Sequence, residues 1–404
     1  MRKPLTEGLV SGHRNGAQRA AQASGQVDIL VVGQTPPPYG GQAVLIAQIL
    51  TGEYRNARLH HVRMSFSSEM SAIGRVGLAK IWELLRVIAA IYVARLKTGS
   101  RVLYYPPAGP SKVPMLRDLA ILVATRWMFN RTILHFHAGG VSQLYDGLPA
   151  VLRSLYRVAY FDPDVTISQS LSNPDDGGKL RTRREFVVAP GIPDMGADWL
   201  NRPRAPNPRP NLLFVGVLCE EKGVMVLLDA VRRLRDRGHE FDATLVGCFQ
   251  TPEFETECRN LLARHGLGDR VEFTGVLTGD AKWRAFHRAD IFCFPSFFSS
   301  ESFGLVVAEA MSFALPVVAT RWRGIPDLVG NLETGLLVPI QDAEATALAV
   351  KRLLGDPDLR RRLGGNGRRK FLERFTEDRF RRDLDQVFAS LQGSPDPQPA
   401  LNER

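Results

Sequence analysis

The chain has 404 residues, enough for about two or three domains, and its apolar content of 44% and charged content of 23% are those of a globular protein. Its four cysteines lack zinc-binding spacing, no secretory signal precedes them, and no apolar run approaches the roughly 20 residues of a bilayer-spanning helix, so we expect core thiols in a cytoplasmic, soluble or peripheral protein. The net charge of +10 lies mostly in residues 1–200, with 23 Lys and Arg against 14 Asp and Glu, which favours either an anionic partner such as a lipid phosphate or membrane surface, or simply an arginine-rich solvated surface. Nucleic acid is the partner that the sequence favours least, and we expect none, because the basic residues are dispersed and do not alternate with aromatic residues.

The first half of the chain alternates apolar runs with helix-length segments. Residues 1–26 lack periodicity and predict a disordered tail. Val27–Gly33 (VDILVVG) predicts a buried strand, followed by the loop TPPPYGG and a helix from Gly41. Further strands are expected in RVLYYPPA, RTILHFHAGG, DVTISQS and EFVVAPG, with helices over Arg75–Lys97 and Met115–Arg131. This alternation predicts a parallel sheet covered on both faces, in an N-terminal Rossmann-like domain of residues 27–200.

A proline-rich segment, residues 201–210, predicts an interdomain linker. The alternation then resumes over residues 211–375 with strands in NLLFVGVL, FDATLVGC, RVEFTGVL, ADIFCFPS, LPVVAT and TGLLVPI, and helices beginning near Lys222, Pro252, Gly279, Gly304, Gly324 and Asp342. Residues 376–392 predict a last helix, capped by Thr376, which we expect to pack back on the N-terminal domain, and residues 393–404 a disordered tail. The predicted fold class is α/β, with two doubly wound domains facing across a cleft where ligands bind at the strand ends.

The stretch ESFGLVVAEA places two glutamates, Glu301 and Glu309, in an otherwise apolar run. If a helix begins near Gly304, the free backbone N–H groups of Phe303, Gly304 and Leu305 form an anion site at the strand ends. Carboxylates accept hydrogen bonds from sugar and ribose hydroxyls, so the pattern suits a nucleotide sugar. The alternative is that Glu301 complements the helix dipole and Glu309 lies on the surface.

A second segment, FVGVLCEEKGVMVLLDA, brings Gly216 to the end of a predicted strand and Lys222 to the start of the following helix. A lysine in that place can bind phosphate. The alternative is a solvated helix lysine.

Together with LPVVATRWRGIPDLV and ETGLLVP, these motifs resemble the retaining glycosyltransferases of the GT-B fold, family 4, over the chain between its tails. The resemblance implies that Glu309 holds the nucleotide ribose, that Glu301 holds the transferred sugar, and that the amides of Phe303, Gly304 and Leu305 contact sugar and phosphate. It also implies that Gly216 and Lys222 belong to the donor site.

Two N-terminal motifs extend the resemblance. TPPPYGG is similar to the family's Gly-Gly loop, which implies that Gly40 and Gly41 lie near the donor phosphate. HFHAGG is similar to a strand end whose histidine, here His137, hydrogen-bonds the donor. His135 lies on the same strand face and could serve instead, and a core histidine is the alternative for either.

The chain departs from the family pattern at several positions. Val217 stands where the family has a phosphate-binding Arg, and Pro190 stands where an Asn precedes Gly191. Arg321 and Arg323 are the candidate substitutes for the missing cation. The family also has a GG-x-x-E segment, which corresponds to residues 323–327 of this chain. Asp327 is its second acid, and Arg323 takes the place of its first Gly.

The resemblance implies a hexosyl transfer from a UDP- or GDP-sugar to a glycan or lipid-linked acceptor, with retention, no metal and no cofactor, in surface polysaccharide or glycolipid biosynthesis. The two DPD sequences, 162–164 and 356–358, are interpreted as a turn before a strand and a helix cap rather than a metal motif. Three alternatives stay open: an epimerase or hydrolase, and a non-catalytic sugar-nucleotide-binding or scaffolding subunit, which Val217 favours. For helix 75–97 two interpretations stay open. It lies on the cytoplasmic face of an anionic membrane, or it packs on the sheet.

Overall fold

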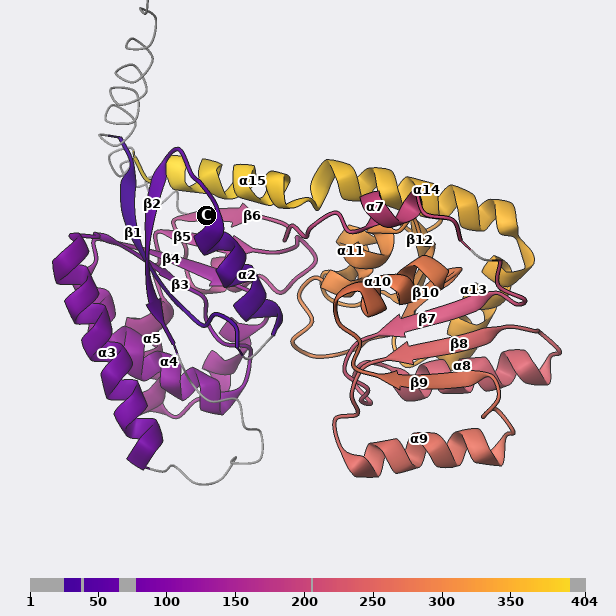
Figure 1. Ribbon diagram of the computed structural model, residues 1–404. Coiled ribbons are helices and arrows are strands. Elements are labelled where there is room, and N and C mark those ends of the chain that lie inside the picture. The colour runs from indigo at the N-terminus through magenta and orange to yellow at the C-terminus, as the bar shows by residue number, and fades with distance from the viewer. Residues whose placement is uncertain (1–24, 38–39, 65–77, 205, 393–404) are drawn as a thin grey trace, which may run out of the picture.

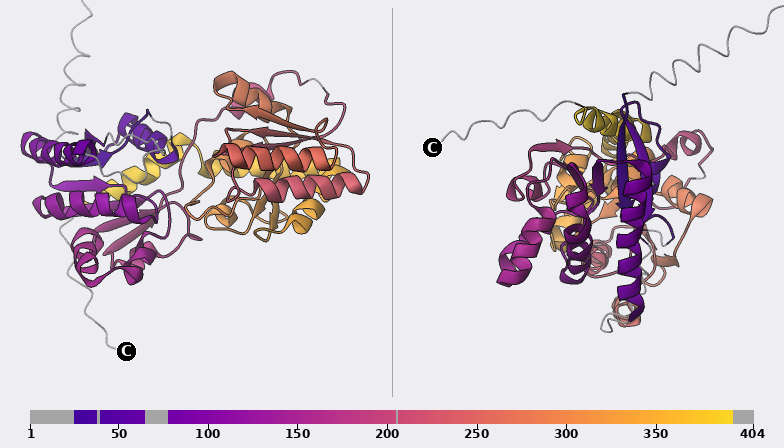
Figure 2. Two further views of the ribbon diagram at one scale, coloured as in Figure 1. Left: turned by 90° about the horizontal axis from the view of Figure 1, so that it is seen from below. Right: turned by 90° about the vertical axis from the view of Figure 1, so that its left-hand side faces the viewer.

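The computed structural model describes residues 25–37, 40–64, 78–204 and 206–392. The two predicted tails lie outside these residues, except for the last two residues of 1–26. Two α/β domains sit side by side, joined once through the Pro-rich segment and again by the C-terminal helices (Figures 1 and 2). Within the described part of the chain, no helix is both long and apolar enough to cross a bilayer.

The first sheet is wholly parallel, with strand order β2-β1-β3-β4-β5-β6. Four predicted runs and Val27–Gly33 form strands there, and the sixth strand, β2, was not predicted. Its sequence ARLHHVR is polar because β2 is the edge strand, where only two of seven residues are buried. The bounds are β1 Val27–Gly33, β2 Ala57–Arg63, β3 Val102–Tyr105, β4 Arg131–Phe136, β5 Val165–Ser168 and β6 Arg184–Val187.

Helices cover both faces of this sheet. One face carries α3 (Leu78–Thr98), α4 (Lys112–Thr125) and α5 (Ala150–Tyr160), and the other carries α2 (Gly41–Thr51) and the C-terminal helix α15 (Glu377–Ala389). The helix predicted over 115–131 was too long, because a 3-10 turn, η2 (Arg126–Met128), ends it and Arg131 already begins β4. The short elements are η3 (Val141–Gly147), α6 (Asp176–Lys179) and α7 (Gly196–Leu200), of which α7 packs on the second domain.

The second sheet has the order β12-β11-β10-β7-β8-β9, which is the Rossmann arrangement with its reversal between β7 and β10. All six predicted strands are present: β7 Asn211–Val215, β8 Asp242–Val246, β9 Val271–Gly275, β10 Ile291–Phe294, β11 Val317–Thr320 and β12 Gly335–Val338. The helices are α8 Val224–Asp236, α9 Pro252–Arg264, α10 Gly279–Arg288, α11 Leu305–Ser312, α12 Ile325–Leu328, α13 Ala343–Gly355 and α14 Pro357–Arg374.

The chain returns to the first domain through α14 and α15, which run along one side of both domains (Figure 1). The Thr376 hydroxyl caps α15, as predicted, by accepting a hydrogen bond from the Arg379 amide. Apolar side chains of α15, including Phe380 and Phe388, complete the core on one face of the first sheet together with Ile29 and other β1 residues. Burial of such side chains contributes about 2 kcal/mol each, so α15 is a structural part of the first domain.

Candidate functional site

Two helix N-termini face each other between the domains. Gly41 begins α2 and Leu305 begins α11, and a Cβ atom built on Gly41 would lie 3.7 Å from Cδ1 of Leu305. Gly304, the N-cap of α11, has φ 85°, a left-handed conformation that favours glycine, and Gly40 has open space around its Cα. Helix N-termini carry unpaired N–H groups and positive partial charge, so the place where α2 and α11 meet favours an anion.

Lys222 lies at the same edge, just before α8. Gly223 has φ 76°, and a Cβ there would lie 2.1 Å from the backbone oxygen of Pro295, so only glycine lets this turn approach the end of β10. The approach brings Nζ of Lys222 to 2.6 Å from Oε2 of Glu301. The ammonium also lies 4.5 Å from the centre of the Phe298 ring. The Lys222 and Glu301 side chains are 18% and 11% exposed, so this ion pair is largely desolvated.

Glu309 lies inside α11 and is mostly buried, which corrects the alternative of a surface residue. Its Oε1 accepts a hydrogen bond of 2.7 Å from Nζ of Lys282, on α10. Its Oε2 is buried without a partner among the described residues. Burial raises the pKa of Glu309, and the Lys282 ammonium offsets part of that effect. A buried carboxylate oxygen without a donor is costly, so a ligand hydroxyl is the expected partner.

The two histidines of HFHAGG differ in environment. His135 is fully buried, stacks on His137 with ring centres 4.2 Å apart, and pairs through Nδ1 with the Tyr104 hydroxyl. His137 follows the last residue of β4 and is partly exposed. The Gln169 amide nitrogen lies 3.0 Å from Nδ1 of His137, so with the amide in this orientation an N–H donates to Nδ1 and the imidazole proton resides on Nε2.

Burial lowers the pKa of His137 to about 3, so the ring is neutral at physiological pH. Its Nε2 is buried with no partner in the described chain. His137 therefore offers one neutral N–H donor to a ligand in the cleft. His135, already held by Tyr104, is better explained as a core residue, although its own Nε2 is also unpartnered.

Ser302, between Glu301 and Phe303, ties the two domains together. Its hydroxyl lies 2.5 Å from the backbone oxygen of His137 and 2.6 Å from Oε1 of Gln169. Its own backbone oxygen accepts a hydrogen bond of 2.9 Å from Nδ2 of Asn173. The loop that carries Glu301 is thus positioned directly by the strand end that carries His137.

A second contact between the domains involves Asp327 of α12. Its carboxylate accepts hydrogen bonds from the hydroxyls of Ser170, at 2.5 Å, and Ser172, at 2.7 Å, and from the Ser172 amide at 3.1 Å. Burial alone would raise the pKa of Asp327, but these hydrogen bonds outweigh it and the pKa is lowered. Asp327 therefore stays charged and joins α12 to the loop after β5.

The cations that could replace the missing arginine lie in different places. Val217 is 44% exposed and supplies no charge. Arg321 is exposed, whereas Arg323 is partly buried with φ 49°, and a Cβ on Gly140 would lie 3.4 Å from its Nη1. Nε of Arg323 is buried and unpartnered among the residues that the structure describes. Arg323, beside the HFHAGG loop, is thus the better-placed substitute.

The structure brings together most of the predicted site residues at the facing strand ends: Gly40, Gly41, His137, Lys222, Glu301, Phe303, Gly304, Leu305 and Glu309. Gly216 directly follows β7, where its N–H donates to the Val246 carbonyl oxygen. Sequence reasoning missed Lys282, Ser302 and Gln169. Nothing in their local sequence marks them, because their roles arise from contacts between distant segments. Among the described residues, no group of three or more His, Cys, Asp or Glu side chains could hold a metal ion.

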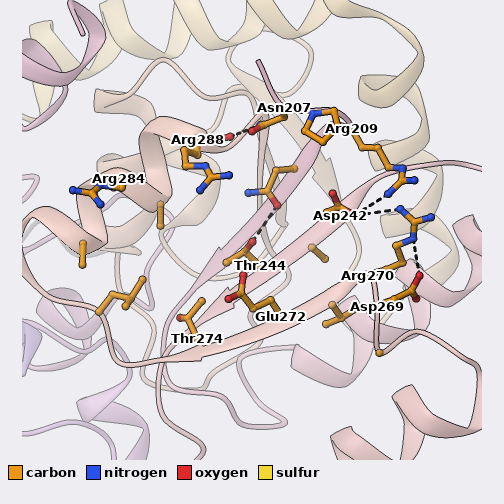
Figure 3. Close-up of a pocket in the computed structure, with 18 residues that line it drawn as sticks. Asn207, Arg209, Asp242, Thr244, Asp269, Arg270, Glu272, Thr274, Arg284 and Arg288 are labelled. Carbon is orange, nitrogen blue, oxygen red and sulfur yellow. Dashed lines mark hydrogen bonds and ion pairs between the residues drawn. The ribbon is translucent and has the colours of Figure 1, made fainter. Parts of the chain in front are cut away.

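Another hollow, of about 540 Å³, lies on the second domain (Figure 3). It is lined by the beginnings of β7 and β8, by β9 and by α10, including Asn211, Asp242, Thr244, Glu272, Arg284 and Arg288. Gly216 and Lys222 stand at the opposite edge of the same sheet. This hollow is therefore separate from the site between the domains.

Two Rossmann-like domains whose strand ends face each other define the GT-B class of glycosyltransferase folds. The structure of Anabaena Alr3699/HepE in complex with UDP-glucose is similar, with a TM-score of 0.65 and 16% identity, covering 90% of this chain and 100% of that chain. At that identity the likeness shows the fold alone.

Residues 197–370, which make up most of the second domain, match the family model described as Glycosyl transferases group 1. An alpha-D-kanosaminyltransferase of Streptomyces kanamyceticus is 33% identical over 159 residues, 39% of this chain and 40% of that protein. The putative colanic acid biosynthesis glycosyltransferase WcaL of Escherichia coli K12 is 27% identical over 253 residues, 56% of this chain and 61% of that protein. The chain thus spans about two fifths to three fifths of the length of these curated relatives.

Proposed function

We propose that the protein transfers a sugar, with retention of configuration, from a nucleoside-diphosphate sugar to an acceptor hydroxyl. The observation that carries the proposal is the convergence of two facing helix N-termini, the Lys222–Glu301 pair and the unpartnered Oε2 of Glu309 at one cleft. The binding of UDP-glucose by a neighbour of the same fold and the transferase names of the relatives support it.

In the proposed complex the diphosphate lies between the N-termini of α2 and α11, within reach of Lys222. Oε2 of Glu309 accepts a ribose hydroxyl and Glu301 accepts hydroxyls of the transferred sugar. Nε2–H of His137 donates to the sugar or to a phosphate oxygen. Lys222 already pairs with Glu301, so the nucleotide sugar must either bind both side chains of this ion pair or separate them. Phosphate binding to Lys222 is therefore coupled to the orientation of the Glu301 carboxylate, which binds the sugar.

In the proposed reaction, the acceptor oxygen forms a bond to the anomeric carbon on the side from which the diphosphate departs. The electron pair of the breaking carbon–oxygen bond stays with the diphosphate, and the acceptor proton passes to its departing oxygen. The protein supplies orientation and fixed positive charge from Lys222 and the two helix ends. This scheme requires neither a nucleophilic side chain nor a metal ion.

The acceptor is proposed to be a glycan or lipid-linked saccharide of surface polysaccharide or glycolipid biosynthesis. It would bind on the first domain, at the cytoplasmic face of the membrane. The basic charge of that half of the chain and the colanic acid relative support this assignment.

The test is a panel of UDP- and GDP-sugars, measured for binding by calorimetry and for slow release of free nucleoside diphosphate. We expect one donor to bind and be hydrolysed, and Glu309→Gln to lose both, whereas Glu272→Gln, in the separate hollow of the second domain, retains both. Proton NMR of the released sugar or product then reports the anomeric configuration. Tight binding without any release of nucleoside diphosphate or transfer to saccharide acceptors would instead assign the chain to a sugar-nucleotide-binding scaffold.

A further inference from the structure

The outer face of α3 is apolar from Trp82 to Leu96. Its exposed residues Trp82, Leu85, Ala89, Val93 and Leu96 follow one another at spacings of three or four, which places them on one stripe. Trp82 is 70% exposed and Leu96 is 78% exposed. A helix on the surface of a globular protein normally turns polar residues to water, and α3 instead packs Val87 and Ile91 inward while showing a second apolar stripe outward.

The neighbouring helices repeat this pattern. On α4 and the η2 turn that follows it, the outward residues are Val113, Leu116, Ala120 and Trp127, and on α5 they are Val151, Leu155 and Val158. Trp127 is 72% exposed. We call the outward residues of α3, α4, η2 and α5 named here and above the docking face.

The three stripes form one surface rather than scattered exposed residues. α4 contacts both α3 and α5, and the right-hand view of Figure 2 shows the three helices side by side. The Trp127 ring bridges two of them, because its centre lies 6.3 Å from that of Tyr92 on α3. Isolated exposed apolar side chains are ordinary, but a contiguous face of this kind marks an interaction site.

The charged residues of the three helices are almost all positive, and two acids beside Trp127 and Val158, Asp162 and Asp164, are paired with Arg181 and Arg183. The helices α3, α4 and α5 carry only two acids, Glu83 and Asp118, and Asp118 is fully buried and bonded to Tyr105 and Arg117. Basic residues in the same helices are Lys80, Arg86, Arg95, Lys97, Lys112, Arg117, Arg153 and Arg157. A second copy of this positive face would repel the first, whereas a negatively charged bilayer surface would attract it.

Tryptophan is the side chain that prefers the boundary between lipid and water, because its ring is apolar and its indole N–H is polar. Trp82 lies near the beginning of α3 and Trp127 follows the end of α4, so the face has one at each end. We propose that the docking face binds the surface of an anionic membrane, with the apolar stripes at the acyl boundary and the arginines and lysines among the headgroups.

The orientation of the helices indicates what membrane binding by the docking face would achieve, and this step rests on the proposed function. The strands β3 and β4 end at the cleft, and α4 and α5 begin after them, so the beginnings of these helices adjoin the donor site. A lipid-linked acceptor whose headgroup emerges beside Lys112 would reach the cleft without leaving the bilayer. The docking itself requires neither donor nor acceptor.

The test is co-sedimentation of the full chain with vesicles, in low salt and without nucleotide. One vesicle type is phosphatidylcholine alone and the other an equimolar mixture with phosphatidylglycerol. We expect binding to the mixed vesicles, weakened by salt because screening shortens the reach of the charges to about 10 Å.

Two double variants probe the apolar and the charged parts. Trp82→Gln with Leu96→Gln should lower the partition coefficient by about tenfold for each side chain, and Arg86→Gln with Lys97→Gln by about fivefold for each charge. The matched controls are on the second domain: Val276→Gln with Leu348→Gln, both exposed, and Arg284→Gln with Arg288→Gln, which Figure 3 shows on α10. The controls should bind vesicles like the unaltered chain.

The proposal is overturned if the chain ignores anionic vesicles, or if it binds them equally well after both face substitutions. A concentration-dependent dimer in sedimentation equilibrium that the Trp82 variant abolishes would assign the face to a second copy instead. Thermal unfolding of each variant shows that loss of vesicle binding is not loss of fold. Donor binding, measured separately without vesicles, tells whether a failure concerns this face or the transferase proposal.

Discussion

Nζ of Lys222 lies 2.6 Å from Oε2 of Glu301, so the two charges proposed to hold the donor's phosphate and sugar neutralise each other in the unliganded protein. Removing one partner of a mostly buried pair leaves the other charge desolvated, and we expect Lys222→Met to lower the free energy of unfolding by about 2 kcal/mol or more. Urea denaturation measures this change.

The double variant Lys222→Met, Glu301→Gln separates stability from function. It leaves no unpaired charge, so we expect most of the lost stability to return, whereas release of nucleoside diphosphate stays absent. If stability does not return, the pair is not the source of the loss; if turnover returns, neither side chain acts on the donor.

Glu309 predicts a pH dependence of nucleotide binding. The buried carboxylate must be charged to accept a ribose hydroxyl strongly, and burial raises its pKa above the ordinary 4.5. The affinity for UDP or GDP should therefore fall on acidification at a higher pH than an exposed glutamate would cause. Lys282→Met removes the ammonium that lowers this pKa, so the fall should move to still higher pH. Calorimetric titrations over a pH series measure both.

Glu309→Gln provides the control for that series. The loss of a hydrogen bond to a charged group should weaken nucleotide binding by about tenfold to a hundredfold, and the pH dependence should vanish. The sign for stability is opposite to that for binding: a carboxyl whose pKa is raised by folding stabilises the fold at low pH, and this contribution is lost as pH rises through the raised pKa. A pH-dependent affinity that survives Glu309→Gln would show that another group titrates.

The hydrogen bonds from Ser170 and Ser172 to Asp327 hold the two domains together. We expect that removing them weakens domain closure without changing a residue proposed to bind the sugar nucleotide. Ser170→Ala with Ser172→Ala removes both hydroxyls that bond the Asp327 carboxylate. Each such bond contributes about 1.5 kcal/mol or more, so we expect a larger radius of gyration in small-angle X-ray scattering. Asp280→Asn, an exposed acid on α10, is the control and should leave the radius unchanged.

The same contact has a predictable response to acid. Because folding lowers the pKa of Asp327, its contribution is complete above the ordinary value of 3.8 and is lost as pH falls through the lowered pKa. The radius of gyration should therefore stay constant down to about pH 4. Opening of the unaltered protein at a clearly higher pH would contradict this role for Asp327.

Two adjacent glycines of α14 predict opposite effects of the same substitution. A Cβ on Gly364 would lie 2.0 Å from the backbone oxygen of Ala314, whereas a Cβ on Gly365 would meet nothing within 4 Å. Gly364→Ala should displace the helix from the loop after α11 and destabilise the fold by about 2 kcal/mol or more. Gly365→Ala should stabilise it by about 0.5–1 kcal/mol, because alanine favours a helix interior. Thermal denaturation compares the two directly, and equal effects would contradict this packing.

The sequence predicted best those elements that are buried on both faces. All six strands of the second sheet are short apolar runs, and periodicity alone locates them. The edge strand β2 was missed because one side of it faces no partner strand and its side chains are largely polar. The beginning of helix α14 was predicted correctly, since Asp356 of the second DPD sequence caps it. Its extent was not predicted, because Gly364, Gly365 and Gly367 are typical of loops, yet Gly364 and Gly367 are small so that the helix can lie close to Ala314 and Met311.

The candidate site could be predicted as a set of residues but not as a set of contacts. Helix starts and carboxylates pointed to Lys222, Glu301 and Glu309, since local patterns mark both. That Lys222 pairs with Glu301, that Lys282 pairs with Glu309, and that Ser302 reaches Gln169 depend on segments brought together only by the tertiary fold. For α3 the sequence left open whether its apolar side faces a membrane or the sheet, and the outward stripes of α4 and α5 were not predicted, because periodicity does not show which side of a helix meets the sheet.

The helix α15 makes the order of synthesis matter. Asn56 of the first domain is bonded to Asp385, 329 positions further on, and Phe380 and Phe388 fill the core beneath β1. On the ribosome the first domain emerges with one side of its core bare, while the second domain, complete in itself, is still being made. Of these two domains, the one translated earlier is thus finished later, and until α15 has emerged its apolar face is open to chaperones and to misassembly.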